Sequence, residues 1–130
     1  MEKMTKKKVS FTLPFPPSVN KMYGNTPDGG RYLLPKVKRY YDQCYFEIYQ
    51  QCGNKIPKFF KKVTMMIEFF PRRNGGWDVN NFNKAPEDAI VKAGVIPDDQ
   101  VKYLQPQAPV IHKRVPRDAQ PYIKITLEEI

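Results

Sequence analysis

Alternation of apolar and polar side chains predicts two strands in the first half of the chain. Residues 8–15 alternate in this way, and so do residues 61–70. Because a period of two puts successive side chains on opposite faces of a sheet, we expect each strand to be half buried. The inward positions are then Val9, Phe11, Leu13, Val63, Met65, Ile67 and Phe69.

Apolar spacing of three and four residues predicts a helix that starts at Pro35 and stops at Gly53. Within it, Cys44 and Cys52 would lie roughly 12 Å apart along the helix axis, too far for a disulfide. We expect both cysteines in the core and a reducing, intracellular setting. With His112 as the only histidine, no Cys/His zinc cluster is possible. The predicted apolar face is Val37, Tyr41, Cys44, Tyr45, Ile48 and Cys52.

A second helix is predicted to end at Gly94, with Asn81 or Asn83 as its cap. Lys84 would then lie about one and a half turns inside it. Pro86 fits only in the first turn or so. The apolar positions are Phe82, Ala85, Ala89, Ile90 and Ala93.

A long loop, residues 16–34, separates the first strand from the first helix, and residues 21–23 can pair with 31–33 as a hairpin. Two later strand-like runs cover residues 101–114 and 122–127, and prolines push the former towards a sheet edge. The order of elements predicts an α+β fold, in which a mixed β-sheet is flanked by two helices.

The whole chain, residues 1–130, is expected to be a single domain with a basic N-terminal arm at residues 1–7. Its 22 Lys+Arg and 13 Asp+Glu give a formal net charge of +9. That excess favours a polyanionic partner, with nucleic acid ahead of an anionic membrane surface. The alternative is a cationic protein whose charge only confers solubility.

Membrane association is not expected. No long basic amphipathic helix is present, and the apolar runs are too short to span a bilayer. No apolar stretch follows the basic start of the chain, so we expect no secretory signal.

The densest polar cluster is residues 78–84, followed by Asp98 and Asp99. A phosphodiesterase needs hard oxygen ligands for Mg²⁺ and a cation beside the phosphate. This cluster offers both, and it is flanked by Arg72 and Arg73. A short antiparallel return could bring the two late aspartates back to the strand end.

Each part of this cluster also has an ordinary structural interpretation. Asp78 ahead of a helix is most often a cap. Lys84, Asp88 and Lys92 are spaced by four and can form a solvated salt-bridge stripe. The late aspartates can be a turn. Spacing alone favours these structural interpretations.

Residues 78–101, DVNNFNKAPEDAIVKAGVIPDDQV, resemble the signature segment of the RusA-type crossover-junction endonucleases. That signature runs Asp-x-Asp-Asn, then Lys, Asp-Ala, Gly-Val and a final Asp-Asp. Residues 11–23, FTLPFPPSVNKMY, are similar to the family's first strand and its Pro-Pro-Ser-x-Asn element. The resemblance covers nearly the whole chain, and its central motif is specific because many residue types coincide.

The resemblance implies a RusA-like fold and a cytoplasmic homodimer, bacterial or phage-encoded, that binds four-way DNA junctions. It further implies that Mg²⁺ or Mn²⁺ is needed, with no small-molecule cofactor and no membrane. Two strands would be cut symmetrically near the crossover. A two-fold protein suits this task because it presents one site to each cut strand. The first strand is one candidate for the dimer surface.

Carried over position by position, Asp78 matches the first catalytic aspartate and Lys84 the essential lysine. Asp99 matches the later catalytic aspartate, with Asp98 beside it, and Asn81 matches the motif asparagine. The implied metal ligands are Asp78, Asn80, Asp98 and Asp99, and the implied catalytic residues are Asp78, Asn80, Lys84 and Asp99.

Asn80 departs from the family, which has an aspartate there. An amide oxygen can ligate Mg²⁺ but brings no charge, so metal affinity and water activation should fall. Three explanations are open: a degenerate, weakly active member, an introduced substitution, or compensation by another acid such as Glu68 or Glu87. Trp77 also stands where a basic residue is expected, so DNA contacts there are expected to differ.

Basic residues in two regions are expected to contact phosphates. Tyr23 and Tyr32 could stack on exposed bases or pin the loop to the core, and Trp77 could pack or wedge into DNA. The expected DNA-binding residues are Lys21, Arg31, Lys36, Lys38, Arg39, Arg72, Arg73, Asn81, Lys113 and Arg114.

The leading hypothesis is a structure-selective endonuclease that acts on branched DNA. One rival is a junction-binding protein whose chemistry Asn80 has silenced, and metal-dependent cleavage separates the two. Another is a basic structural or regulatory dimer, which predicts no preference for branched DNA and weak salt dependence.

Overall fold

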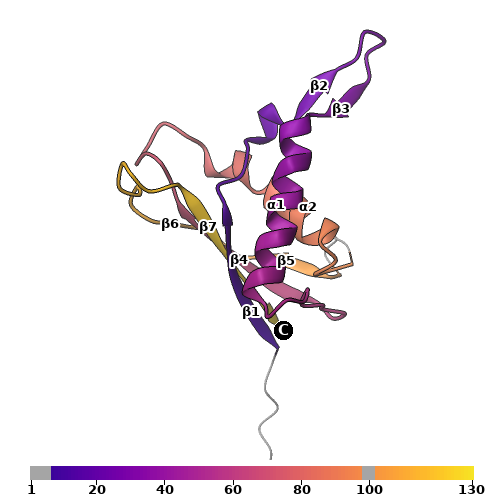
Figure 1. Ribbon diagram of the computed structural model, residues 1–130, viewed down its shortest axis with the longest axis vertical. Helices are drawn as coiled ribbons and strands as arrows, with labels where there is room; N and C mark the ends of the chain where they lie inside the picture. The colour runs from indigo at the N-terminus through magenta and orange to yellow at the C-terminus, as the bar shows by residue number, and fades with distance from the viewer. Residues whose placement is uncertain (1–6, 98–101) are drawn as a thin grey trace, which may run out of the picture.

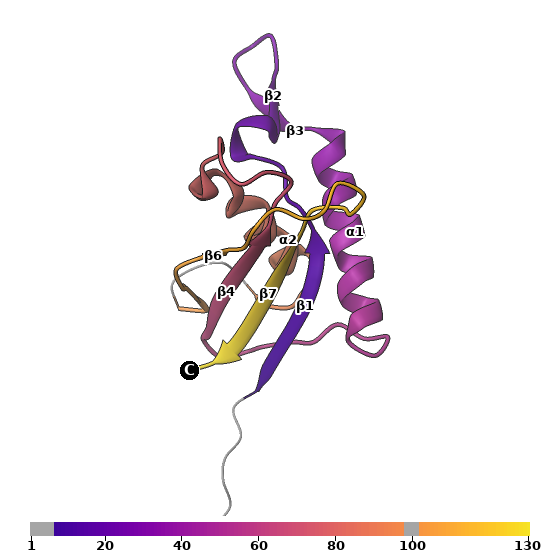
Figure 2. The same ribbon diagram turned by 90° about the vertical axis from the view of Figure 1, so that its left-hand side faces the viewer.

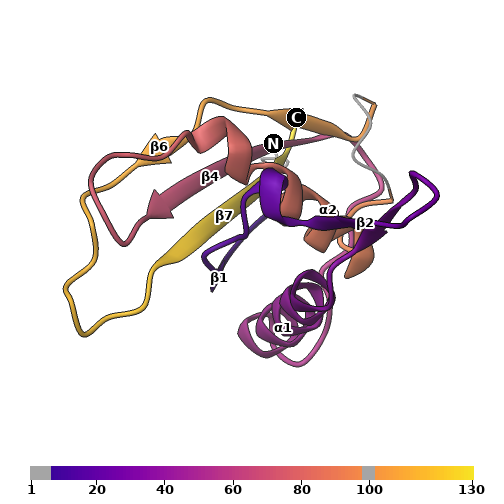
Figure 3. The ribbon, with the colours of Figure 1, turned by 90° about the horizontal axis from the view of Figure 1, so that it is seen from above.

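A five-stranded mixed sheet forms the centre of the molecule (Figures 1 and 2), as a computed structural model of residues 7–97 and 102–130 describes it. Both helices pack on one face of this sheet (Figure 3), so the predicted α+β fold with a mixed sheet and two helices is confirmed. The strands are β1 (Lys8–Pro14), β4 (Val63–Phe70), β5 (Leu104–Pro106), β6 (Val110–Ile111) and β7 (Tyr122–Glu129), and the helices are α1 (Pro35–Gln51) and α2 (Lys84–Lys92).

The strand order β1-β7-β4-β5 makes the sheet mixed, because β7 runs antiparallel to both its neighbours while β5 and β6 run parallel to β4. In β4, every second side chain is buried, as the period-two pattern predicts. The same holds for Phe11 and Leu13 of β1. Pro106 ends β5 and Pro109 lies between β5 and β6, and within the described residues both strands pair only with β4, so the predicted edge position of this run is confirmed.

Helix α1 begins at Pro35, which needs no intrahelical partner for its nitrogen. It ends before Gly53 and Asn54, both of which adopt positive φ angles. The expected place of Tyr45 on the apolar face is wrong: its side chain is 47% exposed, because the buried line runs along Val37, Tyr40, Tyr41, Cys44 and Ile48.

Side chains of α1 form hydrogen bonds with backbone groups on the outer edge of β1. Gln51 Oε1 accepts a hydrogen bond from Thr12 N at 2.7 Å, and Gln51 Nε2 donates to Thr12 O at 2.7 Å. Tyr40 Oη donates to Pro14 O at 2.8 Å. These contacts occupy backbone groups that an unprotected edge strand offers to another chain, which leaves less of β1 for pairing with a second copy.

The predicted hairpin exists but is shifted. Strands β2 (Tyr23–Asn25) and β3 (Arg31–Leu33) pair, whereas Lys21 lies in the short 3-10 helix η1 (Val19–Lys21), which Ser18 caps. Gly24 faces Tyr32, whose ring lies where a Cβ would be, so a larger residue at this position would require the exposed Tyr32 ring to move. The hairpin extends past the start of α1 at one end of the molecule (Figure 1).

Within the described residues, the helices are too short or too polar to cross a membrane.

Candidate active site

Asp78 stands at the start of a 3-10 turn, η2 (Val79–Phe82), that follows the loop after β4. Asp78 Oδ1 accepts a hydrogen bond from Asn80 N at 3.0 Å, and its carbonyl accepts one from Asn81 N at 3.0 Å. Asp78 is therefore a cap, and it is also exposed to solvent, so its carboxylate can meet a ligand from outside.

Of the two predicted caps of the second helix, Asn83 holds the N-cap position of α2 and Asn81 does not. Asn81 lies inside η2, and Asn83 occupies the position before α2 without making a side-chain capping bond. Lys84 is the first residue of α2 rather than one and a half turns inside it, because the preceding residues form a separate 3-10 turn. Pro86 falls in the first turn of α2, as expected.

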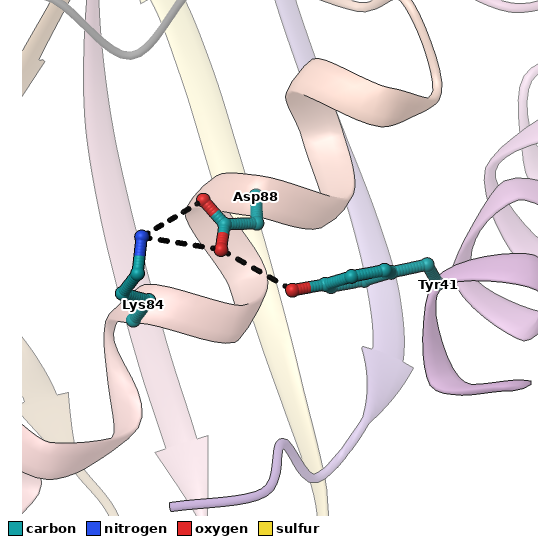
Figure 4. Close-up of polar contacts among 3 residues, drawn as sticks. All are labelled: Tyr41, Lys84 and Asp88. Atoms are coloured by element: carbon teal, nitrogen blue, oxygen red, sulfur yellow. Dashed lines mark hydrogen bonds and ion pairs between the residues drawn. The ribbon is translucent and has the colours of Figure 1, made fainter. Parts of the chain in front are cut away.

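Lys84 is held by Asp88, one turn further along α2. Lys84 Nζ lies 3.3 Å from Asp88 Oδ2 and 3.4 Å from Asp88 Oδ1. Tyr41 Oη, from α1, donates to Asp88 Oδ2 at 3.2 Å, so the lysine and the tyrosine meet the same carboxylate (Figure 4). The Lys84 side chain is 46% exposed and that of Asp88 21%.

This contact fixes Asp88 between the two helices. Burial first, and then the Asp88 carboxylate, raise the pKa of Tyr41, so the phenol stays protonated and donates at neutral pH. Lys92 Nζ lies 5.5 Å from the centre of the Tyr41 ring. The Lys84–Asp88 part of the predicted stripe is confirmed, but Lys92 contacts the tyrosine ring. Spacing along α2 could not reveal Tyr41, because it comes from another helix.

Arg72 and Arg73 lie in the exposed loop between β4 and Asp78, and backbone carbonyls hold both guanidinium groups. Arg72 Nη1 donates to Arg117 O at 3.1 Å, and Arg73 Nη2 donates to Gly76 O at 2.8 Å. Arg114 N donates to Asn74 Oδ1 at 2.8 Å, which brings the end of the β6 segment against this loop. Lys113 and Arg114 are both exposed.

The other expected DNA contacts gather around the hairpin and the start of α1. All are exposed, and the Arg31 guanidinium lies 4.3 Å from the centre of the Tyr23 ring. Turn η1, which carries Lys21, contacts turn η2, so this basic region adjoins Asp78. Its members are Lys21, Arg31, Lys36, Lys38 and Arg39.

Oxygen donors for a metal lie on the exposed turn: the Asp78 carboxylate and the Asn80 side-chain amide. They are of the kind that Mg²⁺ prefers. Across residues 7–97 and 102–130, however, no three His, Cys, Asp or Glu residues come together as a metal site. Asp98 and Asp99, the other expected ligands, lie outside the described residues.

Of the two acids considered as substitutes for an aspartate at position 80, Glu68 is engaged elsewhere. Its Oε1 lies 3.1 Å from His112 Nε2. Glu68 occupies one of the alternate positions of β4 whose side chains point away from the core. Glu87 lies in the first turn of α2 and lines a small cavity together with Asn83. Along the chain, Glu87 is the nearer of the two to position 80.

Comparisons with known proteins place the chain in a family. A search of curated proteins finds no match. The family model described as Endodeoxyribonuclease RusA matches residues 14–128, nearly the whole chain. The match includes the cap at Asp78, the lysine of α2 and the segment between them. The chain belongs to the RusA endodeoxyribonuclease family.

Proposed function

We propose that this protein is a structure-selective, Mg²⁺-dependent DNA endonuclease that resolves four-way junctions by paired symmetric nicks. The observation that supports it most directly is that Asp78, Asn80 and Lys84 occupy one cap, turn and helix start in a member of an endodeoxyribonuclease family. Oxygen donors and a cation then flank the same short segment, as phosphodiester cleavage requires.

Asp78, Asn80, Asp98 and Asp99 would hold Mg²⁺ or Mn²⁺, which when bound supplies a polarised phosphate and a water of lowered pKa. Lys84 stabilises negative charge that builds on the phosphate or the leaving oxygen. Asp88 orients the Lys84 ammonium, since it contacts Nζ and is itself held by Tyr41. The Lys84 side chain is about half exposed, so a phosphate can approach it from the solvent side.

The two basic regions position the DNA backbone. One lies on the loop that carries Arg72 and Arg73 together with Lys113 and Arg114, and Asn81 adds a polar group from η2. The other surrounds the hairpin and the start of α1 and adjoins η2 through η1. We place the enzyme in the cytoplasm of a bacterium, host- or phage-encoded, as a homodimer with one site for each cut strand.

Asn80 supports a second candidate, a junction-binding protein with impaired chemistry. The exposed amide supplies no charge for a cation, and the described residues offer one carboxylate on this turn. DNA binding would survive such a change because the basic residues of both regions are unaltered.

A cleavage assay on matched substrates tests the proposal. The chain is incubated with a synthetic four-way junction or with a linear duplex of the same arm sequence, in Mg²⁺ and in Mn²⁺. We expect paired nicks at symmetric positions of the junction and an intact duplex. Tight, salt-sensitive junction binding without cleavage in either metal would select the impaired binder. Equal binding to both DNAs would reject both candidates.

A further inference from the structure

A small cavity of about 130 Å³ lies directly beside the turn that carries Asp78. Its walls are the rings of Phe15, Trp77 and Phe82, together with two prolines, and Arg72 and Arg73 also line it. The accessible lining is almost wholly apolar. Drug-sized ligands need roughly 300–1,000 Å³, so this cavity suits a single planar group.

The three rings form a rigid frame. Their centroids lie 5.8 Å apart for Phe15–Trp77, 5.5 Å for Phe15–Phe82 and 5.4 Å for Trp77–Phe82, and each pair meets edge to face. The indole is also fixed by a hydrogen bond from Trp77 Nε1 to Arg73 O at 3.2 Å. Because each ring is held by the others, the walls are set before a ligand arrives.

Cationic groups accompany these rings. The guanidinium groups of Arg72 and Arg73 are exposed, and the contacts to Arg117 O and Gly76 O hold them in place. Each of those contacts uses one of the five N–H donors of a guanidinium, which suits further bonds to phosphate oxygens. An apolar aromatic slot with fixed cations beside it matches a flat ring that carries an attached anion.

We propose that this cavity receives one unstacked nucleobase of the DNA, next to the phosphate that is cut. Trp77 immediately precedes Asp78 in the chain, and Phe82 ends the turn that Asp78 caps. A base that lies in the cavity against these rings therefore places its own backbone beside the Asp78 carboxylate and within reach of the arginines. Positioning of this kind is a large part of what a phosphodiesterase site contributes.

Branched DNA supplies such a base more readily than a linear duplex. Pulling a base out of the stack costs least where it is already unpaired or poorly stacked, as at a crossover. The cavity thus gives the enzyme a way to distinguish branched from linear DNA. This inference rests on the proposed junction endonuclease, but it concerns a separate group of residues from Asn80 and Lys84.

The protein carries its own probe for this contact, because Trp77 is its single tryptophan. The unmodified chain is titrated in EDTA with an end-labelled four-way junction and with the matched duplex. Label anisotropy reports DNA binding, and tryptophan emission reports stacking on Trp77. We expect the junction to quench Trp77 and the duplex to quench it far less at equal occupancy.

A scan of the junction with single abasic positions then locates the base. One position near the crossover should abolish the quenching and weaken binding about tenfold, which corresponds to the loss of one base–aromatic stack. Phe82→Leu should weaken junction binding to a similar extent, with Phe60→Leu, whose ring is 78% exposed, as the control. Thermal unfolding shows whether each variant is folded.

The outcomes separate this inference from the proposed function. Junction-selective binding with no quenching, or with quenching that no abasic position removes, overturns the cavity proposal and leaves the endonuclease intact. Equal anisotropy curves for junction and duplex overturn both. If Phe82→Leu fails to fold, the abasic scan on the unmodified chain still decides.

Discussion

At one end of the candidate site, the Asp88 carboxylate holds Lys84. Tyr41, from the other helix, donates a hydrogen bond to the same carboxylate. At the other end, Asp78 is exposed, and its carboxylate accepts a bond from within its own turn. Packing between α1 and α2 thus sets the position of the cation, while a short local turn sets that of the oxygen donors.

This difference indicates that the two ends can be perturbed separately. Changes at Asp88 or Tyr41 should alter the rate of cleavage without altering the requirement for metal. Changes at Asn80 should alter the requirement for metal without disturbing the two helices. Substitutions at Lys84, Asn80 and Asp88, and unfolding at alkaline pH, test this separation.

Lys84→Ala should reduce the single-turnover rate of junction cleavage about 100- to 1,000-fold. Removing one group that stabilises transition-state charge has an effect of this size in other enzymes. Junction affinity should change little, because many other basic residues are proposed to contact phosphates. Lys92→Ala removes the same charge from the last turn of α2 and serves as the control. Full turnover by Lys84→Ala would remove the lysine from the mechanism.

Asn80→Asp should lower the Mg²⁺ concentration for half-maximal cleavage about tenfold, because a carboxylate attracts a divalent cation far more strongly than an amide does. Asn81→Asp adds the same charge one position along the turn and is the matched control. Rates are measured across a Mg²⁺ titration at constant ionic strength. An unchanged midpoint would mean that position 80 does not face the metal.

Asp88→Asn should lower the cleavage rate about tenfold, equivalent to about 1.4 kcal/mol, and leave the Mg²⁺ midpoint unchanged. The amide keeps the shape of the side chain but loses the charge that orients Lys84 Nζ. Tyr41→Phe removes one partly buried hydrogen bond to Asp88 and should cost about 1 kcal/mol of unfolding free energy in a urea titration. A shifted Mg²⁺ midpoint in Asp88→Asn would contradict the separation of the two ends.

Alkaline pH should reduce the contribution that the Tyr41–Asp88 contact makes to the stability of the folded protein. Burial and the Asp88 carboxylate raise the pKa of Tyr41 above its usual value of 10.0, so the unfolded chain loses this proton before the folded chain does. Stability from this group is therefore complete below pH 10 and falls as pH rises beyond it. Urea unfolding across this range should show a smaller decline for Tyr41→Phe, but not for the control Tyr45→Phe, whose ring is 47% exposed.

The sequence predicted those parts of the fold that depend on local periodicity. The alternation in β4 and the spacing in α1 are properties of short segments, and both elements were found where the pattern indicated. The predicted position of Lys84 inside the helix is wrong because Val79–Phe82 form a separate 3-10 turn, and the sequence pattern of such a turn does not differ from the start of a helix. The hairpin starts at Tyr23 instead of Lys21, because Lys21 belongs to the 3-10 helix η1, which Ser18 caps.

The site was predictable in composition but not in its contacts. The resemblance implies roles for Asp78, Asn80 and Lys84, and the structure places these residues on one cap-turn-helix segment. Tyr41 lies 47 positions from Asp88 in the chain. Phe15 comes before the hairpin and α1 in the sequence, whereas Trp77, which its ring contacts, comes after them. No spacing rule predicts such contacts, because they arise only when helices and loops pack.

The most direct test of the central claim is to map the nicks that this chain and Asp78→Ala make in a synthetic four-way junction. Binding is measured in parallel by anisotropy. We expect paired symmetric nicks by the unmodified chain in Mg²⁺ or Mn²⁺, and none by Asp78→Ala, although its junction affinity stays within a few-fold of the unmodified chain. Unchanged nicks from Asp78→Ala would show that the residues around this turn do not cut DNA.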